Sequence, residues 1–177
     1  MRVIGVDPGS AVTGFGIIER QGGAVNHIAA GVIRTHSHAI YRNKLLTIYQ
    51  RLGQLIDQYA PDAMSLERSF VAANVQSAFR LGEARAMALL AAATNHLELF
   101  EYAPAHVKLT VAGHGRADKS QVKFMVRRAL AMDDTAPLTD DAADALAIAL
   151  CHISMARFPA PAPRGRRMVG GGANGRV

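Results

Sequence analysis

Short apolar segments separated by turn-forming residues open the chain. Residues 1–7 form an apolar run, residues 12–18 are rich in β-branched side chains and glycine, and residues 24–35 are again strand-like. A Gln-Gly-Gly sequence at 21–23 supplies a turn between the second and third segments. The pattern predicts three strands that are joined as an antiparallel meander.

The spacing of the apolar residues then changes to that of a helix. From Tyr41 the apolar side chains recur every three or four residues, and Pro61 ends the segment. Residues 63–67 read as a further short strand, and Asn74 is a suitable N-cap for a second helix. This part of the chain therefore predicts a helix, a strand and a second helix.

The second predicted helix is apolar around most of its circumference. No polar side chain stands between Arg85 and Thr94. Such a helix lies at the centre of a core or is shared with a second subunit, and both can hold for one helix. Its main stripe consists of Val75, Ala78, Phe79, Gly82, Ala86, Leu89, Leu90 and Ala93.

The last part of the pattern predicts one more strand and three helices. The strand covers residues 97–102, a helix starts at Pro104, and two further helices cover about 118–132 and 140–155. The whole order is three strands, two helix–strand pairs and three helices. It predicts an α/β protein with a five-stranded mixed sheet flanked by helices, in which the later strands join through helical crossovers.

Composition narrows the class of protein. A chain of 177 residues with 50% hydrophobic and 19% charged residues suits one domain with a sizeable core. Its longest apolar run, 86–93, is too short to span a bilayer, so we expect no membrane association. Cys151 is the one cysteine, and Asp7 interrupts the segment in which a secretion signal would be apolar. We expect a reducing, cytoplasmic location.

The net charge of +6 is concentrated at the end of the chain. Residues 157–177 hold five arginines and no acidic residue, so residues 1–156 have 15 basic and 14 acidic side chains. The end is also rich in proline and glycine, and we expect it to be a disordered tail after a domain that covers 1–156. The tail is either a solubilising extension or a source of non-specific phosphate attraction, and both can hold.

Two acidic residues stand at the ends of predicted strands. Asp7 closes the first strand and precedes Pro8-Gly9, and Glu67 ends the strand at 63–67. If these strands are parallel neighbours, both carboxylates lie at the same edge of the sheet, where α/β folds commonly place ligands. The alternatives are a turn-forming aspartate and a solvated glutamate.

Two more acidic residues begin the last predicted helix. Asp141 and Asp144 are three residues apart and therefore share one helix face, while the alanines between them permit close approach to a sheet. We interpret Asp140 as the cap of this helix. The alternative for the cluster is that acidic residues in a first turn only complement the helix dipole.

Together these acids favour a site for hard cations. Oxygen ligands from three separate segments suit Mg²⁺ or Mn²⁺, and the ions would remove the repulsion between the carboxylates. A carboxylate shared between two metal ions is the usual basis of phosphodiester cleavage. The residues therefore point to a metal-dependent nuclease.

Six motifs add a family resemblance: Gly5-Val6-Asp7-Pro8-Gly9, Thr13-Gly14-Phe15-Gly16, Leu66-Glu67-Arg68-Ser69-Phe70, Leu81-Gly82-Glu83-Ala84-Arg85, Gly113-His114-Gly115-Arg116-Ala117-Asp118-Lys119 and Asp141-Ala142-Ala143-Asp144-Ala145. In order and spacing they closely resemble the RuvC Holliday-junction resolvases, over about residues 1–155. The resemblance implies a ribonuclease-H-like fold and a homodimer. It further implies paired symmetric nicks in a four-way DNA junction during recombination and repair, made with two Mg²⁺ ions per active site or with Mn²⁺ in their place.

The resemblance also implies roles for single residues. Asp7 would bridge two metal ions, Glu67 and Asp144 would complete them, and Asp141 would be a ligand or position the water. Phe70 matches the aromatic residue beside the crossover of the junction, and a core phenylalanine is its alternative. Further candidates for contacts to the DNA backbone are Lys108, Lys119, Arg80, Arg116 and Lys123; for the last three we favour a solvated surface charge.

Partners and competing functions follow from the same comparison. The resemblance implies a RuvA–RuvB branch-migration complex as partner. Sugar kinases and actin-like ATPases share the sheet order, but they need a second phosphate-binding half. The sequence contains no phosphate-binding loop that could replace this half. A relative that processes RNA would keep the sheet without needing all four acids or Phe70.

Overall fold

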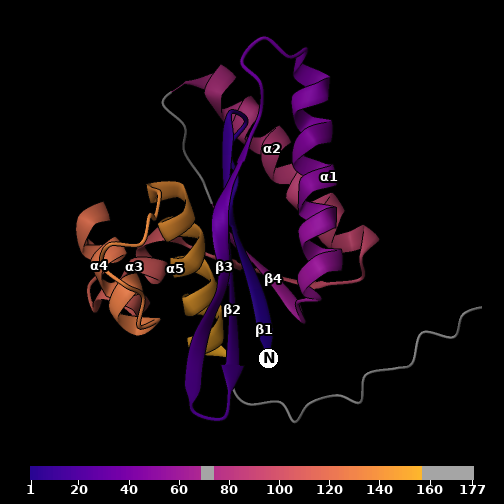
Figure 1. The fold of residues 1–177 in the computed structure, drawn as a ribbon. Helices are drawn as coiled ribbons and strands as arrows, with labels where there is room; N and C mark the ends of the chain where they lie inside the picture. Colours follow the sequence, from indigo (N-terminus) through magenta and orange to yellow (C-terminus); the bar gives the residue numbers. More distant parts are fainter. Residues whose placement is uncertain (69–73, 157–177) are drawn as a thin grey trace, which may run out of the picture.

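A five-stranded mixed sheet forms the centre of the computed structural model, which describes residues 1–68 and 74–156. The strands are β1 (Arg2–Asp7), β2 (Val12–Gln21), β3 (Ala24–Arg34), β4 (Ala63–Glu67) and β5 (Glu98–Tyr102). Their order in the sheet is β3-β2-β1-β4-β5 (Figure 1). The first three strands pair antiparallel, and β4 and β5 add to β1 in parallel, which confirms the predicted fold class.

The helices cover the sheet from both sides. They are α1 (Tyr41–Tyr59), α2 (Val75–Thr94), α3 (Pro104–Ala112), α4 (Lys119–Ala129) and α5 (Asp140–Met155). In Figure 1, α1 and α2 lie on one side of the sheet, and α3, α4 and α5 lie on the other. The predicted order of elements is confirmed. The helix expected over about 118–132 ends at Ala129, and Ala131 beyond it has a left-handed backbone.

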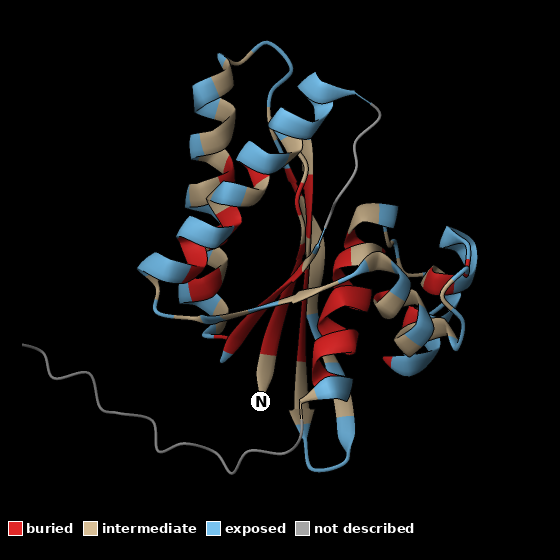
Figure 2. Ribbon diagram, turned by 180° about the vertical axis from the view of Figure 1, so that it is seen from behind, coloured by how far each residue is buried: buried red, intermediate tan, exposed pale blue. Residues whose placement is uncertain are grey.

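Each layer of helices encloses its own apolar core. One core, which includes Ile4, Ile48 and Leu66, lies between the sheet and the pair α1 and α2. The other is built around α5, which is buried along most of its length (Figure 2). Among the described residues, no helix is both long and apolar enough to cross a membrane.

Glycines in β1 and β2 let α5 lie unusually close to the sheet. A Cβ atom on Gly5 would stand 2.1 Å from the carbonyl oxygen of Ala145, and one on Gly14 would stand 2.0 Å from that of Asp141. No side chain fits at these distances. The strand glycines therefore set the position of the first turns of α5, which carry two of the candidate acids.

The face of α2 that enters the core differs from the predicted stripe. The buried residues are Ala84, Ala88, Ala91 and Ala92, whereas Val75 and Phe79 of the predicted stripe are 72% and 67% exposed. Both faces repeat with the period of a helix, so periodicity alone does not distinguish them. Close packing of α2 against its neighbours selects the small alanines, whereas Leu89 and Leu90 are exposed like Val75 and Phe79.

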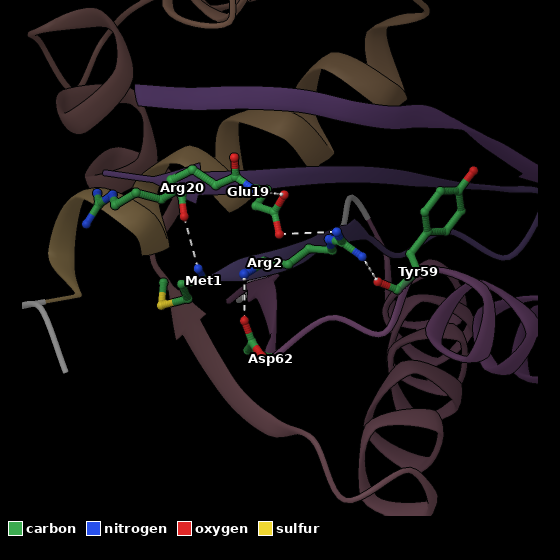
Figure 3. A network of polar contacts seen from close by, with 7 residues as sticks. Met1, Arg2, Glu19, Arg20, Tyr59 and Asp62 are labelled. Atoms are coloured by element: carbon green, nitrogen blue, oxygen red, sulfur yellow. Dashed lines mark hydrogen bonds and ion pairs between the residues drawn. The ribbon is translucent and has the colours of Figure 1, made fainter. Parts of the chain in front are cut away.

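A polar network anchors the amino-terminal end of β1 (Figure 3). The guanidinium group of Arg2 donates to the carboxylate of Glu19 at 3.1 Å and to the backbone carbonyl of Tyr59, while the Arg2 amide donates to Asp62 at 2.7 Å. These contacts join β1 to β2 and to the connection between α1 and β4. They lie at the opposite end of β1 from Asp7.

The tail expected over 157–177 lies outside the described residues, as does Phe70. The domain boundary at 156 therefore stays a prediction.

Candidate active site

The parallel pairing of β1 and β4 brings the first two candidate acids to one edge of the sheet. Val6 pairs with Leu66. Asp7 and Glu67 are the next residues on their strands, so both stand at the carboxyl ends of adjacent strands. This confirms the expectation that they share an edge. Both residues are partly buried.

The first turn of α5 brings the other two acids toward the same edge. Thr139 is the N-cap of α5, because its hydroxyl oxygen accepts from the amide of Ala142 at 3.3 Å. The interpretation of Asp140 as the cap was therefore wrong. Asp140 forms an ion pair with Lys123 at 2.8 Å and is well exposed, whereas Asp141 and Asp144 interact electrostatically with Asp7.

The other three acids act electrostatically on Asp7. Burial, followed by the charges of Asp144, Glu67 and Asp141, raises the pKa of Asp7 from 3.8 to about 7. Burial and the charge of Asp144 also raise the pKa of Glu67. The site thus collects more negative charge than its own environment stabilises.

Lysines provide part of the compensation. The ammonium group of Lys119 lies 3.4 Å from Oδ2 of Asp144, while its side chain remains 73% exposed. Burial raises the pKa of Asp144, and Lys119 opposes this rise. Lys108 and Lys119 both act to lower the pKa of Glu67. Two of the predicted DNA-contacting residues therefore lie within electrostatic reach of the acids.

The other predicted DNA contacts lie in different surroundings. The guanidinium group of Arg80 lies 5.9 Å from the centroid of the Tyr41 ring, on the α2 side of the sheet. Arg116 is exposed in the loop before α4. Lys123 is paired with Asp140, which supports its interpretation as a surface charge. Phe70 cannot be placed, since it lies outside the described residues.

The donor set suits a hard divalent cation. Asp7, Glu67, Asp141 and Asp144 offer only carboxylate oxygens. The pKa of Asp7 is raised by burial first and by the neighbouring carboxylates second, and a bound cation would favour the charged form against both. Within residues 1–68 and 74–156, however, no three His, Cys, Asp or Glu side chains form a group that could already hold a metal ion. Asp144 is instead in contact with the ammonium group of Lys119 at 3.4 Å. The residues fit a metal ion whose charge would draw them together.

One residue beside the site carried no predicted role. Arg85 donates from its guanidinium group to the backbone carbonyl of Glu67 at 3.3 Å and forms an ion pair with Glu101. The sequence signal was weak: Arg85 belongs to one of the six motifs and is the last charged residue before the apolar half of α2. Its contact with β4 depends on the tertiary structure, which the pattern does not contain.

One histidine is built into the core. His152 on α5 is 4% exposed, and its Nδ1 atom lies 2.7 Å from the hydroxyl of Tyr102. Burial lowers the pKa of His152, which favours the neutral ring. This pair ties β5 to α5 and is structural.

Comparisons with known proteins identify the family of this chain. The family model described as crossover junction endodeoxyribonuclease RuvC matches residues 3–152. A protein of that name from Geobacter sulfurreducens is 45% identical over 156 residues, which cover 88% of this chain and 94% of the relative. Another from Saccharophagus degradans is 48% identical over 152 residues, which cover 86% of this chain and 87% of the relative.

Solved structures give the same result. The RuvC protein of T. thermophilus, solved in complex with a Holliday junction substrate, has a TM-score of 0.81 and 32% identity, and the match covers 86% of this chain and 93% of that chain. The yeast mitochondrial Holliday junction resolvase shares the fold, with a TM-score of 0.60 and 16% identity over 84% of this chain and 77% of that chain. From the family match, the sequence identities and the shared fold, we conclude that this chain belongs to the RuvC family of crossover junction endodeoxyribonucleases.

Proposed function

We propose that this chain resolves four-way DNA junctions in recombination and repair by paired, symmetric, metal-dependent nicks. The observation that carries the proposal is the gathering of acids around Asp7, whose pKa rises to about 7 because of burial and of the charges of Asp144, Glu67 and Asp141. Acids in this state suit metal ions and phosphodiester chemistry. Membership of the RuvC family supports the junction as substrate.

The four acids would hold the metal in this proposal. Asp7, Glu67 and Asp144 would bind two Mg²⁺ ions, for which Mn²⁺ could substitute, and Asp141 would either bind an ion or orient the attacking water. When bound, the ions would supply Lewis acidity and an activated water. The chain itself would hold the carboxylates on two strand ends and one helix, so that their geometry is set before DNA binds.

Basic residues at the same edge would receive the DNA backbone. Lys119 and Lys108 already act on the site electrostatically, and an exposed ammonium group can contact a phosphate without losing much solvation. Arg80 would contact the junction from α2. Phe70 would stack on a base beside the crossover. The DNA substrate has a precedent in the T. thermophilus RuvC protein, which was solved in complex with a Holliday junction.

A homodimer would supply the two active sites that paired nicks require. The outward stripe of α2 has exposed apolar side chains at both ends of the helix, Val75 and Phe79 in the first turns and Leu89 and Leu90 in the last. A group of large apolar side chains on one helix favours burial against a second copy of the chain. A RuvA–RuvB complex as further partner, and a cytoplasmic location suited to the free thiol of Cys151, complete the proposal.

Cleavage of a synthetic mobile four-way junction tests the substrate. We expect symmetric nicks in two opposed strands with Mg²⁺ or Mn²⁺, no cleavage with a chelator, and no cleavage of a linear duplex of the same sequence. Cleavage of the linear duplex or of RNA in preference to the junction would keep the metal site and overturn the substrate. Junction binding without any cleavage would leave a DNA-binding protein that is not a nuclease.

A further inference from the structure

Arg85 lies on the flank of α2 that faces the end of β4. On the helix circumference it stands between the buried alanine face and the outward apolar stripe, and its side chain is 21% exposed. The neighbouring turns of α2 carry Ala84 and Ala88 into the core. A long charged side chain at this boundary needs a partner, because burial alone disfavours its charge.

Two acceptors meet the Arg85 guanidinium group. Nη1 donates to the backbone carbonyl of Glu67 at 3.3 Å, and Nη2 contacts Oε1 of Glu101. Glu101 is on β5, where it pairs in register with Leu66, and Glu67 pairs with Tyr102. One guanidinium group therefore holds the carboxyl ends of both β4 and β5.

The contact with Glu67 is made at the backbone. The sheet bonding continues one residue further on β4, where the amide of Arg68 donates to the carbonyl of Tyr102 at 2.8 Å. The direction of the Glu67 side chain depends on the backbone at this last position of the strand. Arg85 acts on that position from the helix, whereas the sheet acts on it from one side only.

The chemistry requires arginine. The Arg85 side chain is only 21% exposed, and the ion pair with Glu101 offsets the cost of burying its charge. A guanidinium group can donate to two acceptors in a fixed plane, whereas an ammonium group is a point charge on a flexible stem. Lysine would keep the charge and lose the fixed two-point contact.

We propose that Arg85 is a positioning residue for Glu67. By fixing the last backbone position of β4, it holds the Glu67 carboxylate in the direction in which it meets Asp7 and Asp144. The inference rests on the proposed function, since it takes Glu67 to be a metal-holding carboxylate.

A matched control stands at the other end of the sheet. Arg2 also joins a backbone carbonyl, that of Tyr59, to a carboxylate, that of Glu19 (Figure 3). Its side chain is 28% exposed and that of Glu19 is 17% exposed, compared with 21% and 27% for Arg85 and Glu101. Substitution of Arg2 therefore removes the same kind of contact at a place that is remote from the acids.

The experiment compares Arg85→Lys, Glu101→Gln and Arg2→Lys with the wild-type chain. The first readout is the Mg²⁺ concentration that gives half of the Mg²⁺-induced rise in Tm, which needs no DNA. The second is the single-turnover rate of junction cleavage at saturating Mg²⁺, and the third is junction affinity in a chelator. Loss of residues that orient metal ligands typically changes metal affinity or activity by about 10- to 100-fold.

For Arg85→Lys we expect a Mg²⁺ midpoint about 10-fold higher, cleavage at least about 10-fold slower and junction affinity within about 2-fold of wild type. Glu101→Gln keeps the donor to Glu67 and should show a smaller change, of about 3-fold. Arg2→Lys should lower Tm in the metal-free state and leave the Mg²⁺ midpoint and the cleavage rate of the folded protein unchanged.

An Arg85→Lys chain with the wild-type Mg²⁺ midpoint would overturn the inference, and so would an Arg2→Lys chain that changes the midpoint equally. If the wild-type chain cuts no junction, the proposed function fails. The Mg²⁺ midpoint of Arg85→Lys still tests whether Arg85 positions Glu67. If the wild-type chain cuts and Arg85→Lys cuts at the same rate, the inference alone fails.

Discussion

Among single residues, Asp7 is the acid of the site whose negative charge is least favoured by its surroundings. Its pKa rises to about 7 because burial and three neighbouring acids disfavour its charged form. In the absence of metal, a charged Asp7 therefore opposes folding. The same repulsion favours the binding of a cation, so the residue that destabilises the metal-free protein is the one best suited to hold a metal ion.

Asp7→Asn should stabilise the metal-free protein at pH 8. The folded pKa of about 7 lies above the ordinary value of 3.8. Between these values the folded state holds a proton that the unfolded chain has released, so stability falls as pH rises through this window and is lowest above pH 7. We expect a gain on the order of 2 kcal/mol at pH 8 and none near pH 3, measured by urea unfolding in a chelator.

An aspartate of opposite character provides the control. Hydrogen bonds from Thr135 lower the pKa of Asp133, which lies in the loop between α4 and α5. Asp133→Asn should therefore lower stability at pH 8. If Asp7→Asn also lost stability at pH 8, a charged Asp7 would not destabilise the metal-free protein, contrary to this prediction.

Lys119 supplies the next prediction. Its ammonium group lies 3.4 Å from Asp144 and remains largely exposed, so it can stabilise negative charge that develops on a bound phosphate. Lys119→Gln should slow cleavage by about 10-fold at saturating Mg²⁺. Lys44, a partly exposed lysine on α1 that donates to the carbonyl of Ser37, is the control. If Lys44→Gln slows cleavage as much as Lys119→Gln, the effect is one of general charge.

At the scale of the element, the position of α5 depends on the glycines beneath it. A methyl group on Gly14 would collide with the backbone of Asp141, so Gly14→Ala must displace the first turn of α5 or distort β2. We expect a stability loss of about 2 kcal/mol or more and cleavage reduced beyond what the folded fraction explains. Thermal unfolding and single-turnover cleavage in the same samples measure both.

Gly53→Ala is the matched control. Gly53 lies in α1 and a Cβ atom there meets nothing within 4 Å. Because alanine favours a helix by about 1 kcal/mol over glycine, this variant should be more stable and equally active. Wild-type activity in a well-folded Gly14→Ala chain would show that the close approach does not position Asp141.

The elements themselves could largely be predicted from the sequence. The strand at Ala63–Glu67 and the helix at Asp140–Met155 have the predicted bounds, because apolar periodicity and the flanking Pro61 are local signals. The shared edge of Asp7 and Glu67 also followed, since it needs only parallel pairing.

Features set by tertiary packing could not be predicted. The core face of α2 is made of alanines, which hydrophobic pattern alone ranks below Phe79 and Leu89. The cap of α5 is Thr139, although the adjacent Asp140 is an equally good residue for a cap, because the cap depends on which residue leaves the helix. The hydrogen bond from Arg85 to the backbone carbonyl of Glu67 joins residues 18 positions apart. The sequence pattern shows only periodicity, whereas the buried face, the cap and the Arg85 contact depend on how the elements pack in three dimensions.

In the whole molecule, two separate surfaces would serve the two proposed functions, DNA cleavage and association with a second copy. The acids lie at the carboxyl ends of β1 and β4, and the apolar stripe of α2 lies on the side of the sheet away from α5 (Figures 1 and 2). Association through the stripe would leave the acidic edge free for DNA. Two copies would then present two sites to one junction.

Phe79→Asp tests this arrangement. Phe79 is 67% exposed, so a charge there should leave the fold intact and prevent association. By light scattering we expect wild type at about twice 18.9 kDa and the variant at 18.9 kDa. The variant should lose paired nicks. Phe124→Asp on α4, at a residue that is 52% exposed, should remain dimeric; an equal loss of mass there would contradict a role specific to α2.

In the proposed function, the acids around Asp7 form a metal-dependent catalytic site for junction cleavage. The most direct test is the cleavage rate of Asp7→Asn on a four-way junction with Mg²⁺, measured on protein that is folded and bound to the junction. We predict normal binding and a rate reduced by at least about 1,000-fold, since the residue would bridge the metal ions. Cleavage within about 10-fold of wild type would contradict the claim.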